Sequence, residues 1–190
     1  MNEVDIIKLA TLAYWRFDRQ HIMGAIECSG ADVKTVSRNL MIAETEVKVT
    51  IADMRREVKT KRYKHRRMNG EFATALMTYP TSTHYQPEVN YFYFIVPERL
   101  KDKALKAVAE LYPYAGLLVC RDGVKDIYSY VGERQNVYSV KPAKRMSRNK
   151  PDIEEITRIG FAATNTTIRY GNKLLTQRTI NNKSAGVFNG

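Results

Sequence analysis

Three charged residues have the types and the spacing that phosphodiester hydrolysis needs. Glu46 and Lys48 stand two residues apart in the stretch AETEVKVT at 43–50, and Asp32 lies upstream of them. Side chains two apart on a strand share a face, so Glu46 and Lys48 would point the same way. Hydrolysis of a phosphodiester commonly uses a metal ion to stabilise developing charge and to generate hydroxide near neutral pH. The pattern therefore predicts a catalytic set of Asp32, Glu46 and Lys48.

A β-hairpin would bring the two acids together. The stretches 31–38 and 40–50 read as two strands joined by a tight corner, which would place Asp32 and Glu46 close to opposite each other. Two carboxylates and the main-chain carbonyl of Val47 are oxygen ligands of the kind that magnesium takes. We therefore expect Mg²⁺, or Mn²⁺ in its place, as the cofactor. Its ligands would be Asp32, Glu46 and Val47.

The segment that follows the hairpin is the most basic part of a chain whose net charge is +11. Thr50 followed by Asp53 resembles a capping box and predicts the start of a helix over 51–67. Like charges on successive turns repel, so this helix would gain from a polyanion that releases its counterions on binding. A second basic stretch spans 141–150. The residues that we expect to contact nucleic-acid phosphates are Arg55, Arg56, Lys59, Arg62, Lys64, Lys144 and Arg145.

The periodicity of the rest of the chain predicts an α/β fold. A strand, a helix and a strand joined by short connections imply a parallel crossover, so we expect a mixed central sheet flanked by helices. The expected helices cover 2–19, 98–112 and 151–170, the further strands cover 23–27, 90–97, 115–120 and 124–131, and the segment 68–89 is expected to be a loop.

The composition predicts one domain over residues 1–140 and a basic C-terminal extension over 141–190, partly helical with a flexible tail. Cys28 and Cys120 each end an apolar stretch, which favours reduced thiols in a cytoplasmic protein. The longest apolar runs are strand-sized and too short to span a bilayer, so no membrane partner is expected.

The order of these residues resembles the PD-(D/E)xK nuclease superfamily, in which an acid on one strand precedes Glu-x-Lys on the next. A longer set of stretches between about 24 and 150 resembles the MmcB-like group of DNA-repair nucleases. These stretches are ADV, EVKVTIADMRREVKTKRYKH, NYFYFIVPE, PYAGLLV and AKRMSRNK. The resemblance implies a restriction-endonuclease-like αβββαβ core and a metal-dependent nuclease that acts on DNA in repair, recombination or phage DNA processing.

Members of the superfamily often use one more acid, which makes Glu27 a candidate metal ligand here; the alternative is a surface carboxylate. The inserted segment 68–89 and the basic C-terminal extension depart from the pattern. They leave open whether the substrate is DNA or RNA, and whether the protein works as a homodimer.

Two other functions fit the same residues. The first is a DNA- or RNA-binding module of the same fold with a weak or absent active site. The second is an interaction protein whose positive charge meets an acidic protein. Within the nuclease site we expect Asp53 to cap a helix rather than bind metal, Glu44 to be structural, and neither His65 nor His84 to transfer protons.

Overall fold

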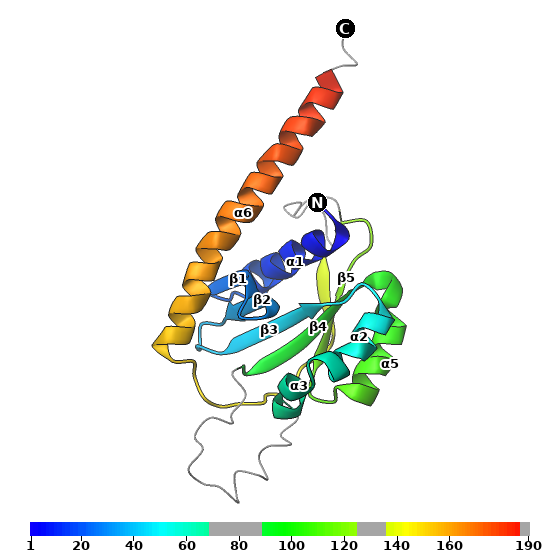
Figure 1. The fold of residues 1–190 in the computed structure, drawn as a ribbon, viewed down its shortest axis with the longest axis vertical. Coiled ribbons are helices and arrows are strands. Elements are labelled where there is room, and N and C mark those ends of the chain that lie inside the picture. The colour runs from blue at the N-terminus through cyan, green and yellow to red at the C-terminus, as the bar shows by residue number, and fades with distance from the viewer. Residues whose placement is uncertain (69–88, 125–135, 187–190) are drawn as a thin grey trace, which may run out of the picture.

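The computed structural model describes residues 1–68, 89–124 and 136–186, and a single mixed sheet of six strands forms its centre. The strands are β1 (Met23–Cys28), β2 (Ala31–Val36), β3 (Ile42–Val47), β4 (Tyr91–Pro97), β5 (Gly116–Cys120) and β6 (Val137–Lys141). They lie side by side in sequence order, as Figure 1 shows. The β3/β4 and β4/β5 pairs are parallel and the other pairs are antiparallel. The predicted α/β class and mixed sheet are confirmed.

Helices cover both faces of this sheet (Figure 1). They are α1 (Glu3–Ala13), α2 (Ile51–Thr60), α3 (Arg62–Met68), α5 (Lys101–Leu111) and α6 (Ile153–Gly186), with a π-helical turn at Tyr14–Asp18 and a 3₁₀ turn at Glu98–Leu100. On one face, α1 packs through residues such as Ile7 against Val33 and Ile95. On the other face, α2 and α5 pack through Met54 and Val108 against the sheet. The sheet therefore has two separate hydrophobic layers.

The hairpin of β2 and β3 forms as predicted. Val36 pairs with Ile42 and Val33 pairs with Thr45 in the antiparallel register. The chain turns between them with a hydrogen bond of 2.9 Å from the Ser37 N–H to the Met41 carbonyl. Continuing this register by one residue beyond Val33 brings residue 32 beside residue 46.

Alternation along β3 divides its side chains between the two layers. Ala43 and Val47 enter the apolar layer beneath α1, whereas Ile42 enters the layer beneath α2 and α5. Because side chains on a strand alternate, Glu44 and Glu46 share the face of Ile42. The layer beneath α2 and α5 is therefore charged next to β3, whereas Phe92 and Phe94 of β4 belong to its apolar part.

The predicted basic helix is in fact two helices. Thr50 caps α2, and its hydroxyl accepts a hydrogen bond of 3.1 Å from the Asp53 N–H, as its position predicts. The helix ends at Lys61, whose φ of −111° and ψ of 36° lie outside the helical region. Arg62 then begins α3. The basic segment is therefore interrupted at Lys61 and is not one continuous helix.

The C-terminal helix is longer than its periodicity predicts. It continues past Tyr170 to Gly186 and extends away from the rest of the chain (Figure 1). Its first half lies along β1, where Thr166 accepts a hydrogen bond of 2.9 Å from the Ile26 N–H. Lys34 of β2 also pairs with Glu155 at 2.5 Å. The beginning of α6 is thus packed on the same sheet.

Two sequence-based predictions fall on parts of the chain that are not described. The loop expected over 68–89 lies almost entirely outside the described residues, and so does the strand expected over 124–131. Beside β4, β5 pairs with β6, a strand that was not predicted from the sequence. Within the described residues no helix is both long enough and apolar enough to cross a membrane. Both cysteines are free and buried, as expected.

Candidate functional site

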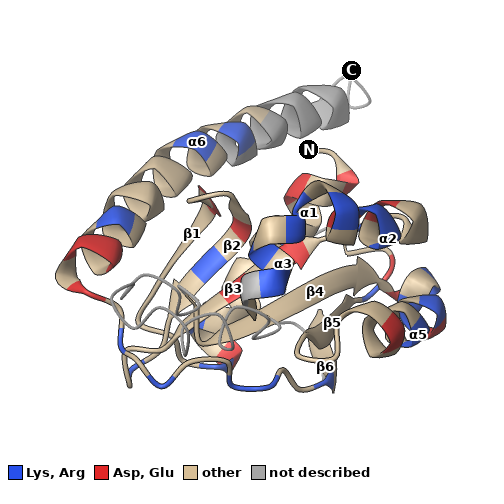
Figure 2. Ribbon diagram, turned by 60° about the horizontal axis from the view of Figure 1, so that its bottom comes forward, with Lys and Arg blue, Asp and Glu red and all other residues tan. Residues whose placement is uncertain are grey.

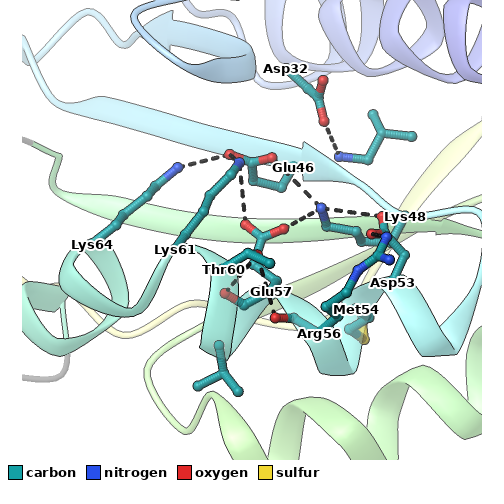
Figure 3. A network of polar contacts seen from close by, with 12 residues as sticks. Asp32, Glu46, Lys48, Asp53, Met54, Arg56, Glu57, Thr60, Lys61 and Lys64 are labelled. Carbon is teal, nitrogen blue, oxygen red and sulfur yellow. Dashed lines mark hydrogen bonds and ion pairs between the residues drawn. The ribbon is translucent and has the colours of Figure 1, made fainter.

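A group of ionisable side chains lies beneath α2 and α3, at the end of β3 (Figure 3). Five of its members are buried, with exposed fractions between 2% and 6%. Ionisable groups are rarely buried without a partner, and their concentration at one place often marks a functional site. We call this group the charge cluster. It consists of the buried residues Glu44, Glu46, Lys48, Glu57 and His65, with Lys61 and Lys64 on its outer side.

Lys48 is held at the centre of the cluster by carboxylates. Its ammonium group forms an ion pair with Glu57, lies 3.5 Å from Oδ2 of Asp53 and lies 4.0 Å from Oε2 of Glu46. Its main-chain N–H donates to the Ile95 carbonyl at 2.9 Å, which continues the parallel pairing with β4. Burial alone would lower the pKa of Lys48, but the contacts with Glu57, Glu46 and Asp53 raise it above its usual value. Lys48 is therefore a cation at neutral pH.

Glu46 contacts two lysines, Lys61 at the end of α2 and Lys64 in α3. Its Oε1 accepts hydrogen bonds of 2.8 Å from Lys61 and 2.7 Å from Lys64. Lys64 also forms an ion pair with Glu44, so one ammonium group serves two acids of the same strand face. Burial raises the pKa of Glu46, and the attraction of Lys64 opposes that rise. The carboxylate is thus costly to keep charged and depends on the lysines beside it.

Glu57 connects α2 to the rest of the cluster. Its Oε1 lies 3.4 Å from Nζ of Lys61 and 3.4 Å from Nε2 of His65, while its other oxygen pairs with Lys48. Burial favours the neutral acid, yet the contacts with His65 and Lys48 hold the pKa of Glu57 at about 2. Sequence analysis missed this residue. Its spacing of four from Asp53 and from Lys61 could have indicated that all three share one helix face.

Tyr112 fixes the position of α2 over the cluster. Its hydroxyl donates a hydrogen bond of 2.6 Å to the Met54 carbonyl and accepts one of 3.0 Å from the Val58 N–H. Burial raises the pKa of this phenol to about 12, so the donor stays protonated. The end of α5 is thereby joined to the turn of α2 that carries Glu57.

Asp32 lies on the strand beside Glu46 but is bonded differently. Its Oδ1 is 2.9 Å from Nζ of Lys8 in α1, and its Oδ2 accepts a hydrogen bond of 2.8 Å from the Val47 N–H. Helix α1 covers the face of the sheet opposite to α2 and α3. The ion-pair partners of Asp32 and Glu46 therefore come from opposite sides of the sheet, although the two acids are on adjacent strands.

Glu27 belongs with Asp32 rather than with the charge cluster. It has a left-handed backbone with φ of 56°, and its carboxylate lies 3.1 Å from Lys8 and pairs with Arg169 of α6. The contacts of Glu27 thus tie together α1, α6 and the β1 edge. Its side chain is 40% exposed, as expected for the alternative of a surface carboxylate.

The oxygen atoms of this region have the chemistry that a hard divalent cation needs. Asp32 and Glu46 are carboxylates, and the Val47 carbonyl lies next to Glu46 in the chain. Each carboxylate is already paired with an ammonium group, and the described residues contain no group of three or more His, Cys, Asp or Glu that could hold a metal. The donor types fit a magnesium ion, but binding by both acids would require the lysines to give way.

Two of the predicted phosphate contacts on α2 are already paired with acids. Arg55 pairs with Glu110 at 3.1 Å and Arg56 pairs with Asp53 at 3.1 Å, so both guanidinium groups already have acidic partners. Both are half exposed or more, and exposed ion pairs of this kind contribute little to stability. A polyanion could therefore compete for these arginines at small cost.

The basic stretch after β6 lies apart from α2. The Lys144 N–H donates to the Tyr114 carbonyl at 2.9 Å, and Arg145 donates to the Ser147 carbonyl at 3.1 Å. Figure 2 shows Lys and Arg both along α3 and along the segment that follows β6. The structure thus leaves Arg145 at the surface, while Lys64 is turned into the charge cluster.

The fold and the site together define an α/β protein with a mixed sheet and a buried ion-pair cluster at the end of its third strand. No protein-family model matches the chain, and no curated protein matches it either. The solved structure of the SPO1766 protein of unknown function from Silicibacter pomeroyi is similar to it, with a TM-score of 0.51. The two share 14% identity, and the match covers 94% of each chain. At this identity the similarity concerns the fold alone.

Proposed function

We propose that this protein is a metal-dependent nuclease that hydrolyses phosphodiester bonds in DNA. One observation carries the proposal. Oε2 of Glu46 in β3 and Nζ of Lys48, the residue that follows β3, lie 4.0 Å apart and are both buried, next to the strand that carries Asp32. Acid, then Glu-x-Lys, on adjacent strands is also the arrangement of the PD-(D/E)xK nucleases that the sequence resembles.

The proposed roles follow from the charges of these groups. Lys48, a cation at neutral pH, would stabilise the negative charge that develops on the phosphate, and Glu57 would hold its ammonium group in position. Because the pKa of Lys48 is raised, we expect Lys48 to stabilise negative charge and not to act as a general base. Asp32, Glu46 and the Val47 carbonyl would hold magnesium or manganese. When bound, such an ion supplies charge neutralisation at the phosphate and a water of lowered pKa.

A nucleic-acid-binding module with no catalytic activity is the second candidate. It is favoured by the lysines that already neutralise the acids, because Lys8 serves Asp32 while Lys61 and Lys64 serve Glu46. In this case the same basic surfaces would bind DNA or RNA, and the charge cluster would serve only to hold α2 and α3 on the sheet.

Cleavage of circular single-stranded and plasmid DNA, with Mg²⁺, with Mn²⁺ and with chelator, distinguishes the two candidates. We expect the wild type to cut only with metal, and the Lys48→Met and Glu46→Gln variants to lose about 10²-fold or more in rate. The matched control is Lys103→Met, which removes an exposed positive charge from α5 and should cut like the wild type. Salt-sensitive binding without any metal-dependent cutting would favour the module, and RNA run in parallel identifies the preferred substrate.

A further inference from the structure

A basic pocket lies between the α2–α3 pair and the end of α5. It encloses about 440 Å³ and is lined by Val58, Lys59, Arg62, His65, Arg66, Leu111 and Tyr114. These residues include one lysine, two arginines and no carboxylate. Pockets of this size usually bind small molecules or single groups of a larger ligand. We call it the basic pocket.

Two of its cations differ from their neighbours on the same helices. Among the described residues, Lys59 and Arg62 have no ion pair, whereas Arg55 and Arg56 each pair with an acid. Like charges gathered around one cavity repel each other, and an anion in the cavity would relieve that repulsion. The pocket therefore favours an anionic ligand over a neutral or cationic one.

The floor of the basic pocket adjoins the charge cluster. His65 is 3% exposed, and its Nδ1 lies 2.5 Å from the Tyr114 hydroxyl. Its Nε2 lies 3.4 Å from Oε1 of Glu57, and no hydrogen bond satisfies either of these two buried atoms. Glu57 in turn pairs with Lys48. A ligand in the pocket would therefore lie two side chains away from the ammonium group of the proposed catalytic lysine.

We propose that the basic pocket binds the terminal phosphate of a nucleic-acid strand. This inference rests on the proposed function, because it takes nucleic acid as the ligand. A phosphomonoester carries about −1.5 to −2 charges at neutral pH, more than the single charge of an internal phosphodiester, so a group of cations favours it. Val58 and Leu111 supply an apolar wall for the attached nucleoside.

Binding of short single strands, measured by fluorescence anisotropy in the presence of chelator, tests this inference without cleavage. The strands differ only in carrying a phosphate or a hydroxyl group at the 5′ or the 3′ end. We expect a phosphate at one of the two ends to tighten binding about tenfold. The Arg62→Ala and Lys59→Ala variants should lose this preference, so that each binds phosphate- and hydroxyl-ended strands within about twofold of each other, and inorganic phosphate should compete only for the phosphorylated strand.

The control Lys103→Ala removes one exposed positive charge from α5 and should keep the full preference. Equal binding of phosphate- and hydroxyl-ended strands by the wild type overturns the inference, and so does a preference that survives in Arg62→Ala with Lys59→Ala. The circular substrate has no ends, so its cleavage tests the proposed nuclease separately. If the protein cuts circular DNA but shows no preference for phosphate-ended strands, the proposed nuclease function is supported and only the proposed ligand of the basic pocket is wrong.

Discussion

The ammonium group of Lys64 lies 2.7 Å from Oε1 of Glu46 and also pairs with Glu44. Two acids of one strand face thus share one lysine of α3. The pairing is largely buried, because the side chain of Lys64 is 24% exposed and those of the two glutamates are 5% exposed or less. Charge pairs at this depth cost more to break than exposed ones, and the first two predictions concern that cost.

Replacing Lys64 by Met should lower the free energy of unfolding by about 2 kcal/mol. Removing one partner of a buried pair typically costs about 3 to 5 kcal/mol, and Lys61 remains to compensate Glu46 in part. Urea denaturation at neutral pH measures the change. The exposed Lys59→Met variant should change stability by less than about 0.5 kcal/mol. The double variant Lys64→Met with Glu46→Gln should regain part of the stability that Lys64→Met loses. If the double variant instead loses the sum of the two single losses, the pairing is contradicted.

Stability should fall with acid partly because of Glu57. Its folded-state pKa is about 2, below the ordinary 4.5, so its contribution is fully present above about pH 4.5 and is lost as the pH falls towards 2. A difference of this size corresponds to about 3 kcal/mol. The gap in unfolding free energy between wild type and Glu57→Gln should therefore shrink across that range. Glu154→Gln, at the exposed start of α6, should show no such trend.

The imidazole of His21 should stay neutral at mildly acidic pH. Burial lowers its pKa to about 4, with help from Arg19 and Arg16, and its Nδ1 lies 2.9 Å from the Thr35 hydroxyl. The stability that it contributes is full above the ordinary value of 6.5 and decreases as the pH falls towards 4. An NMR titration, assigned with His21→Asn, should show a constant imidazole shift down to about pH 5.5. A midpoint near 6.5 would contradict the burial of this ring.

Two glycines should respond in opposite ways to alanine. A Cβ at Gly116 in β5 would overlap the ring of Tyr93 and come within 2.7 Å of the Ala143 nitrogen, so Gly116→Ala should cost about 1 to 3 kcal/mol. At Gly171 in α6 a Cβ meets nothing within 4 Å, so Gly171→Ala should gain about 0.5 to 1 kcal/mol from helix propensity. Thermal unfolding should show a lower melting temperature for Gly116→Ala and a higher one for Gly171→Ala. A Gly116→Ala variant as stable as Gly171→Ala would show that β5 is packed differently.

Much of the sheet could be predicted because its pattern is local. Alternation along 40–50 placed Glu46 and Lys48 on one face, and the short corner after β2 placed Asp32 beside them. Two prolines also mark element ends locally: Pro97 is the last residue of β4, and Pro113 lies two residues after α5. The break of the basic segment at Lys61 was not predicted, because no proline or glycine marks it.

The sequence by itself determined which ionisable residues stand on which strands, because a strand's alternation depends only on neighbouring residues. The tertiary structure alone decided their partners. Lys8 reaches Asp32 because α1 packs on one face, and Lys64 reaches Glu46 because α3 lies over the other. Lys64 was expected to contact nucleic-acid phosphate, yet its side chain is turned into the charge cluster. The reason is physical: buried carboxylates require a cation, and only packing decides which cation lies near enough to provide it.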